Sequence, residues 1–278
     1  MIRLKSLAID GGTTPRMPIL FFGHGSPMNA IEENEFVAGF RAAAADLPEP
    51  RAILCISAHW ETLGSRVTAM EMPRTIHDFG GFPRALFEVE YPAPGAPDVA
   101  DEVRAALGEH IALDHEWGLD HGTWSVVRHL YPEANIPVLQ LSLDRRLTPM
   151  AHLELASNLS VLRRRGILII GSGNLVHNLR EVAWNRLDEP GFGYDWAHEA
   201  SAAIKAAVEG RHWEDLARYA RPHSDPGLAA MQLAVPTPEH FLPVLYFAGL
   251  LENDEDTSFF NDRALGGSLT MTGVTVNW

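Results

Sequence analysis

The sequence predicts an α/β fold, in which helices cover both faces of a sheet. Short β-rich runs recur along the chain, and helical stretches separate them. The runs are continuously apolar rather than alternating, which indicates strands that are covered on both faces. Strands that alternate with helices in this way are typical of an α/β sheet between helical layers.

The expected strands are Ile19–Phe22, Ala52–Ser57, Pro137–Leu143, Ile167–Gly171 and Ser268–Asn277. The expected helices are Glu35–Ala45, Asp98–Leu107, Pro149–Arg165, Tyr194–Glu209, Trp213–Ala220 and Glu239–Leu250. Thr148 is a suitable cap for the helix that begins at Pro149, and proline suits a first turn because its missing N–H has no partner there anyway.

The segment Thr62–Pro97 is irregular and rich in glycine and proline. A loop of this length in a compact domain usually carries function or is partly structured. We therefore expect this segment, which contains "TIHDFGGFP", to lie over or beside a site.

Length and charge limit the classes of protein. The chain has 278 residues, enough for one large or two small domains, and no repeat or long linker divides it. Its formal net charge of −14 argues against a nucleic-acid partner, because phosphate contacts need clustered lysine and arginine. No segment approaches the ~20 apolar residues of a membrane span, and the N-terminal apolar stretch is too short for a secretory signal. We expect a cytoplasmic protein without a membrane partner.

Cys55 is the single cysteine, so no internal disulfide can form. It lies in the apolar run "RAILCISAHW", where a cysteine is usually a small buried core residue. A reducing compartment fits this usage.

Several histidines stand where open α/β sheets bind ligands, beyond the carboxyl ends of strands. They are His24 after Ile19–Phe22, His59 after "AILCISA", His177 after "GILIIGSGNLV", His121 on a loop in "GLDHGTW", and His240 at the start of a helix. Neutral imidazole is the commonest metal ligand, and imidazoles at several strand ends can converge on one ion. The alternative for "GHGSP" is a tight turn that its histidine caps. Both interpretations stay open on spacing alone.

The remaining motifs are weaker. The histidines of "HEWGLDH" are too far apart for H-E-x-x-H, and "GSGNLV" lacks the third glycine of a dinucleotide fingerprint. Pro27 follows Ser26, which is not the Gly-x-Ser-x-Gly elbow of a serine hydrolase. The histidines that we interpret as ordinary surface or capping residues are His110, His129, His152, His198 and His212.

Seven segments, taken together, resemble one known family. They are "FFGHGSPMNA", "ISAHWET", "TIHDFGGFP", "LDHGTWSVVRHLYP", "PVLQLSL", "GSGNLVHNLR" and "PTPEHFLPVL". They resemble the class III extradiol ring-cleavage dioxygenases, and within these the DOPA 4,5-dioxygenase type, which is similar in fold to the catalytic subunit of protocatechuate 4,5-dioxygenase. The resemblance runs from about residue 18 to the C-terminus.

The resemblance implies a single catalytic domain over residues 1–278, with three α/β/α layers around a mixed, mostly parallel central sheet. It also implies a mononuclear metal held by His24, His59 and His240. His177 corresponds to the acid/base histidine of the family and is close enough to the metal in this branch to count as a fourth ligand. His121 corresponds to a second active-site histidine that contacts substrate or oxygen.

The implied reaction opens the ring of a catechol, DOPA-like or a related catecholic acid, with insertion of both atoms of O₂. Fe(II) is the expected catalytic metal, because zinc has no redox chemistry. The wider class of non-haem iron sites has two histidines and a carboxylate, but here the carboxylate position is His240. Three imidazoles also suit Zn(II) as the bound metal. We expect the catechol and O₂ as partners, and a monomer or small homo-oligomer.

Two other functions use the same residues. One is a zinc-dependent hydrolase with metal-bound hydroxide as nucleophile. The other is a non-catalytic scaffold of the same superfamily, although retention of all five histidines favours an enzyme. Candidate substrate contacts are the aromatic residues Trp60, Phe79, Phe82 and Trp124, the loop residue His77, and Arg84 and Arg180 as partners of a carboxylate.

Overall fold

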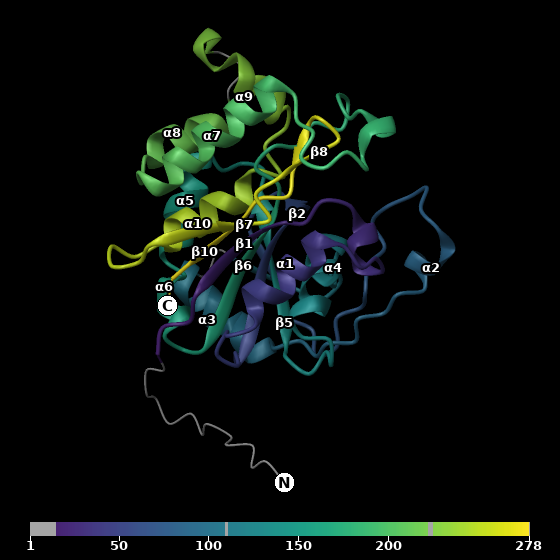
Figure 1. Ribbon diagram of the computed structural model, residues 1–278. Helices are drawn as coiled ribbons and strands as arrows, with labels where there is room; N and C mark the ends of the chain where they lie inside the picture. The colour runs from purple at the N-terminus through teal and green to yellow at the C-terminus, as the bar shows by residue number, and fades with distance from the viewer. Residues whose placement is uncertain (1–14, 109–110, 222–224, 278) are drawn as a thin grey trace.

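The computed structural model describes residues 15–108, 111–221 and 225–277. Within these ranges, an eight-stranded sheet with the order β4-β3-β5-β2-β6-β1-β10-β7 forms the centre of the molecule (Figure 1). Its strands are β1 Ile19–Gly23, β2 Ala52–Thr62, β3 Arg66–Thr68, β4 Ala112–Asp114, β5 Val138–Asp144, β6 Ile167–Gly173, β7 Thr257–Phe260 and β10 Gly273–Val276. A separate two-stranded sheet joins β8 Ala264–Leu265 and β9 Leu269–Thr270.

The sheet is mixed and mostly parallel, as predicted. Strands β5, β2, β6 and β1 are parallel neighbours, whereas β10 pairs antiparallel with both β1 and β7. Strand β3 is parallel to β4 and antiparallel to β5. In the parallel part, Gly23 of β1 lies opposite Gly173 of β6, and Ser57 of β2 lies opposite Ser172. The carboxyl ends of β1, β2 and β6 therefore meet at one edge.

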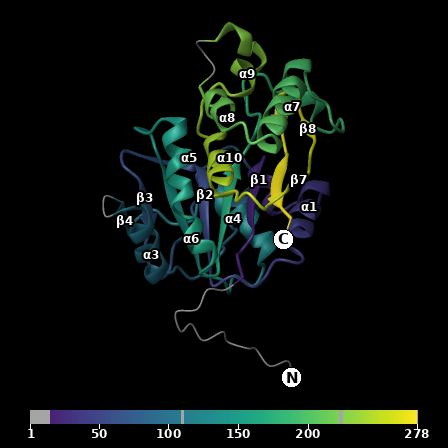
Figure 2. The ribbon, with the colours of Figure 1, turned by 90° about the vertical axis from the view of Figure 1, so that its left-hand side faces the viewer.

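Helices cover both faces of the sheet (Figures 1 and 2). One face carries α3 Pro97–Leu107, α5 Pro149–Ser157, α6 Ser160–Arg163, α7 Asp195–Glu209, α8 Trp213–Tyr219, α9 Ala229–Ala234 and α10 Leu242–Leu250. The other face carries α1 Glu35–Ala44, α2 Arg84–Phe87, α4 His121–Leu130 and the 3₁₀ turn Pro27–Ala30. The predicted α/β fold, with helices on both faces, is confirmed.

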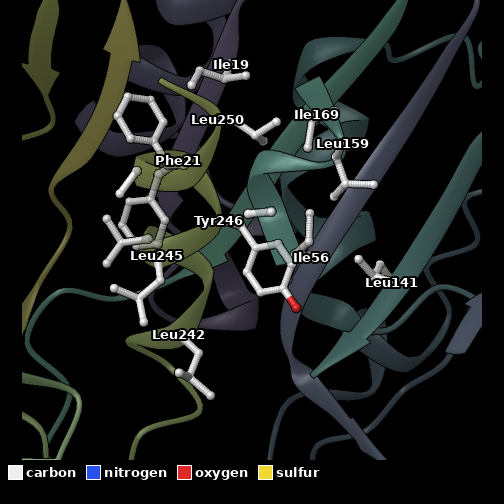
Figure 3. Close-up of a cluster of buried hydrophobic side chains, with 14 of the residues drawn as sticks. Ile19, Phe21, Ile56, Leu141, Leu159, Ile169, Leu242, Leu245, Tyr246 and Leu250 are labelled. Carbon is white, nitrogen blue, oxygen red and sulfur yellow. The ribbon is translucent and has the colours of Figure 1, made fainter. Parts of the chain in front are cut away.

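Alternate side chains of each central strand enter different hydrophobic clusters. On β1, Ile19 and Phe21 belong to the cluster under α10, and Leu20 and Phe22 belong to the cluster under α1 and α4. Figure 3 shows the first cluster, where Tyr246 of α10 lies among strand side chains. All five of these side chains are at most 1% exposed, and burial of each contributes about 1.5–3 kcal/mol.

Some predicted boundaries were wrong. The stretch expected as one strand, Ser268–Asn277, is divided between β9 and β10, because the chain leaves the small sheet for the large one near Met271. The stretch expected as one helix, Pro149–Arg165, is divided into α5 and α6 by a turn after Asn158. The predicted cap was right, since Thr148 accepts the Ala151 N–H.

The elements that the sequence did not predict are mostly short. They are β3, β4, β7, β8, α2, α4 and α9. Cys55 is buried and free, as expected. Across the described ranges, none of the helices combines the length and apolar character that a membrane crossing needs.

Candidate metal centre

Three histidines meet at the edge of the sheet where the central parallel strands end. His24 directly follows β1, His59 lies on β2, and His240 lies in the turn before α10. One ring nitrogen from each is within 4.8 Å of the other two. The structure therefore brings together the three residues that the resemblance implied as ligands.

The glycines beside His24 allow the backbone to turn sharply after β1. Gly25 has φ +63, a conformation that glycine adopts without strain. At Gly23, a Cβ atom would lie 2.6 Å from the carbonyl carbon of Met271. The His24 N–H donates to the Gly173 carbonyl at 3.0 Å, and Asn29 donates to the His24 carbonyl at 2.9 Å. These contacts fix the backbone from which the imidazole projects.

His59 lies within β2 rather than after it, which corrects the sequence prediction. Strand β2 continues to Thr62, and its pairing with β5 shifts register between Ile56 and Glu61. Such an irregularity re-aims side chains at the rim of a sheet. His59 lies inside this shifted segment.

His240 precedes its helix, whereas the sequence predicted a helix from Glu239. Helix α10 begins at Leu242. The His240 carbonyl accepts the Asn174 N–H at 2.9 Å, which ties this turn to the end of β6. The imidazole is buried, with a residue exposure of 8%.

Ser172 determines which ring nitrogen of His24 carries the proton. Its hydroxyl is close to the Gly122 carbonyl and 2.9 Å from Nδ1 of His24. A carbonyl oxygen only accepts, and serine has one hydroxyl hydrogen, so Ser172 donates to Gly122 and accepts from His24. His24 therefore carries its proton on Nδ1 and has a lone pair on Nε2.

Carboxylates have the same effect on the other two histidines. Nδ1 of His59 lies 3.4 Å from Oδ2 of Asp78, and Nδ1 of His240 lies 3.2 Å from Oε1 of Glu239. An ionised carboxylate only accepts hydrogen bonds, so each imidazole places its proton on Nδ1. Outer partners of this kind commonly orient metal-binding histidines.

The resulting arrangement fits a divalent metal ion. Burial lowers the pKa of His24 and of His240 well below its usual value, and it lowers the pKa of His59 to about 3, so all three are neutral near pH 7. The Nε2 atoms of His24 and His59 are 3.2 Å apart. Two lone pairs at this distance repel unless a cation lies between them. Tetrahedral Zn–N bonds of ~2.1 Å would place two nitrogens about 3.4 Å apart.

His121 and His177 border this group without belonging to it. His121 is the first residue of α4, which Asp120 caps, and not a loop residue as the sequence suggested. Its Nδ1 lies 3.0 Å from Oδ1 of Asp78. The ring of His177 stacks on that of His240, with centroids 3.6 Å apart and an interplanar angle of 9°. Burial lowers the pKa of His177 to about 4, so this imidazole is also neutral near pH 7.

All five histidines line one cavity of about 750 Å³. Phe79 and Phe82, from the segment expected beside a site, also line it, so this segment borders the cavity that the five histidines share. Trp60 and Trp124 are core residues instead, each at most 3% exposed. Ser26 lines the cavity but acts as a turn cap, because it accepts the Met28 N–H.

Other candidate substrate contacts lie elsewhere. Neither Arg84 nor Arg180 is among the described residues that line the cavity, and those residues include no lysine or arginine. His77 is 2.9 Å from the Val89 carbonyl oxygen, so it orders the loop. Of the histidines expected on the surface, His152 is in fact buried and contacts Tyr246, whereas His110 lies outside the described residues.

Sequence reasoning missed the partners of these imidazoles. Asp78 and Ser172 belong to quoted segments, but nothing in the sequence pairs them with histidines that lie 19 to 148 positions away. Asp78 follows His77 in the loop, and Glu239 directly precedes His240 in the chain. The Nδ1 contacts of Ser172 and Asp78 arise from the tertiary fold, whereas that of Glu239 joins neighbours in the chain.

Comparisons with known proteins show the family of the chain. The family described as the catalytic LigB subunit of aromatic ring-opening dioxygenase matches residues 14–270. A protein of Escherichia coli K12 named 4,5-DOPA dioxygenase extradiol is 41% identical over 266 residues, which cover 95% of this chain and 96% of the relative. A Beta vulgaris protein of the same name is 32% identical, covering 90% of this chain and 92% of the relative.

A solved structure is similar as well. The crystal structure of an uncharacterized protein from Escherichia coli K12 superimposes with a TM-score of 0.79 at 37% sequence identity, covering 94% of this chain and 100% of the other. Fold and matches together define an enzyme of the extradiol ring-cleavage dioxygenase class. Within that class, the chain belongs to the LigB family of aromatic ring-opening dioxygenases. The family description and the dioxygenase names of the relatives favour this enzyme class over the zinc hydrolase and the non-catalytic scaffold.

Proposed function

We propose that the protein is a non-haem, metal-dependent extradiol dioxygenase that opens the ring of a DOPA-like or related catecholic compound and inserts both atoms of O₂. The observation that carries the proposal is the set of three neutral imidazoles, two buried and that of His59 half-buried, whose Nδ1 atoms all face acceptors. The relatives named 4,5-DOPA dioxygenase extradiol support the catechol as substrate.

His24, His59 and His240 would hold the metal through their Nε2 atoms. Fe(II) is the expected catalytic ion, because it supplies the redox chemistry between substrate and O₂ that zinc lacks. The three donors carry no charge, so the carboxylates of Asp78 and Glu239 are the nearest negative groups behind two of them. Zn(II) would bind the same donors without supporting the reaction.

His177 would be the acid/base residue. Its imidazole lines the cavity and stacks on His240, and it lies outside the three-histidine group. A neutral imidazole facing the cavity can accept the proton that a catechol loses on binding and return it later. The stacked position favours this role over that of a fourth ligand.

His121 would contact the substrate or oxygen. It lines the cavity beside His59, with ring centroids 3.9 Å apart. Phe79 packs edge-on against it at 5.5 Å between centroids. An imidazole next to a ligand and next to an aromatic wall is well placed to hydrogen-bond a catechol oxygen while the ring lies against Phe79.

The proposal is tested by anaerobic reconstitution with Fe(II), addition of L-DOPA or other catechols, and admission of air. We expect consumption of one O₂ per catechol and a yellow ring-opened product. Metal-loaded protein that takes up no oxygen with any catechol would contradict the proposal.

Site variants separate the roles of the histidines. His24→Ala should lose metal, whereas His177→Ala should keep metal and lose turnover. His115→Ala is the matched control, because His115 is exposed and remote from the cavity lining. If His177→Ala lost metal as His24→Ala does, the main role of His177 would be that of a metal ligand and not that of an acid/base residue.

A further inference from the structure

One carboxylate serves two imidazoles of the site. Oδ1 of Asp78 lies 3.0 Å from Nδ1 of His121, and Oδ2 lies 3.4 Å from Nδ1 of His59. Oδ1 also accepts the backbone N–H of His121 at 2.9 Å. The Asp78 side chain is 17% exposed, so solvent competes little for these contacts.

The two contacts determine which ring nitrogen of each imidazole carries the proton. Nδ1 of His121 is close to Asp78 without an aligned hydrogen bond, and it has no hydrogen-bond partner in the described part of the chain, so Asp78 is the acceptor nearest to hand. A carboxylate offers only lone pairs, so both imidazoles place their Nδ1 protons toward Asp78. The Nε2 lone pairs of both then face away from Asp78. His59 directs this lone pair at Nε2 of His24, 3.2 Å away.

We propose that Asp78 is a positioning residue that fixes the tautomer and the ring orientation of His59 and His121 together. Through His59 it maintains metal affinity, and through His121 it presents an acceptor, rather than a donor, to the substrate hydroxyl. The assignment rests on the proposed function for both the metal at His59 and the substrate at His121, whereas the two tautomers follow from the contacts of Asp78 alone.

Asp78 differs from Ser172 and Glu239 in the number of imidazoles that it contacts. Ser172 contacts only His24 among the imidazoles, and Glu239 contacts only His240. Asp78 reaches both His59 and His121 because its loop lies against the first turn of α4, where it accepts the His121 N–H. Loss of its charge therefore affects a ligand and a substrate-facing residue at once.

The most specific variant is Asp78→Asn. A carboxamide has one acceptor oxygen and one donor NH₂, so at most one imidazole keeps its Nδ1 proton directed at residue 78. We expect ¹⁵N NMR of the apo protein to show Nδ1-protonated His59 and His121 in the wild type, and a mixture in Asp78→Asn. Zn²⁺ affinity should fall about 10–100-fold, the usual effect of losing an outer partner.

Two variants control for structure. Asp78→Glu keeps an acceptor-only group, so it should retain the Nδ1 tautomers. Glu71→Gln removes an exposed charge from the same loop and should change neither tautomer nor Zn²⁺ affinity. Thermal unfolding of each variant shows whether the fold survives. If Asp78→Asn does not fold, Asp78→Glu still tests the proposal, because it must keep the tautomers.

A double-mutant comparison tests the link to His121. With saturating Fe(II), His121→Gln combined with Asp78→Asn should turn over no more slowly than His121→Gln alone, because residues that act as a unit are not additive. Unchanged Zn²⁺ affinity and tautomers in Asp78→Asn, or fully additive losses of turnover, would overturn the proposal. The NMR and Zn²⁺ measurements need no substrate, so they remain decisive even if the wild type opens no catechol.

Discussion

Individual residues at the site are held by close packing as much as by hydrogen bonds. Gly122 is the clearest case. A Cβ atom there would lie 2.5 Å from the Ser57 hydroxyl and 2.9 Å from Cδ2 of His59. Because the Ser172 hydroxyl donates to the Gly122 carbonyl, it accepts the hydrogen bond from Nδ1 of His24. A residue without a side chain therefore affects two of the proposed ligands.

We predict that Gly122→Ala destabilises the protein by about 1–3 kcal/mol, the usual cost of overpacking. Alanine in a helix would by itself stabilise by up to about 1 kcal/mol, so the clash must exceed this gain. The free energy of unfolding, measured in urea, and the Zn²⁺ affinity should both decrease. Gly80→Ala is the control, because no atom lies within 4 Å of the Cβ position. A Gly122→Ala protein as stable as wild type would contradict this account.

A buried polar contact joins helices α5 and α10. Helix α5 packs on α10, and Nδ1 of His152 in α5 lies 3.0 Å from the Tyr246 hydroxyl in α10. Burial lowers the pKa of His152 to about 4, compared with its ordinary value of 6.5. The folded protein therefore keeps His152 neutral at pH values where the unfolded chain is protonated.

The sign of the pH effect follows from this difference. Because the unfolded chain binds the proton more tightly, the contribution of His152 to stability is present above pH 6.5 and is lost as pH falls to about 4. Its size is about 3 kcal/mol. We predict that His152→Gln shows a smaller loss of unfolding free energy between these pH values than the wild type does. An identical pH dependence in both proteins would show that His152 is not responsible.

At the scale of the whole molecule, electrostatics favours one kind of substrate. The chain carries a formal net charge of −14. The acidic residues that line the cavity are Glu32, Glu35, Asp188 and Glu189. Glu35 is paired with Arg263 and Glu189 with Arg186, which leaves Glu32 and Asp188 as exposed negative charges beside the entrance.

We predict that a catechol with an ammonium group has a lower KM than one with only a carboxylate. Added salt should raise KM for the cationic compound and lower it for the anionic one, because salt screens both attraction and repulsion. Steady-state oxygen uptake at several ionic strengths measures this. The reverse salt responses would contradict the prediction, as would no response from either compound.

The sequence predicted the layers of this molecule better than its details. Long apolar runs such as Ile19–Phe22 are reliable because burial on both faces determines their composition. Helix α4 was missed, although Asp120 is a suitable cap, because "HGTWSVVRHL" has glycine at its second position and contains β-branched residues. Short edge strands such as β4, with three residues, carry too little pattern.

Part of the site could be predicted from the order of strands and histidines in the sequence. Parallel strands bring their carboxyl ends to one edge, so histidines near those ends could be expected together. The β2 register shift that aims His59 was not readable from the sequence. Neither was the carboxylate of Asp78, since its loop reaches α4 only through tertiary packing.

The most direct test of the account is a crystal structure of the protein loaded anaerobically with Fe(II). We predict one ion, located by anomalous scattering, with bonds of about 2.1 Å to Nε2 of His24, His59 and His240. The Nδ1 atoms should remain toward Ser172, Asp78 and Glu239. An ion bound through Nδ1, or held by other residues, would contradict the central claim.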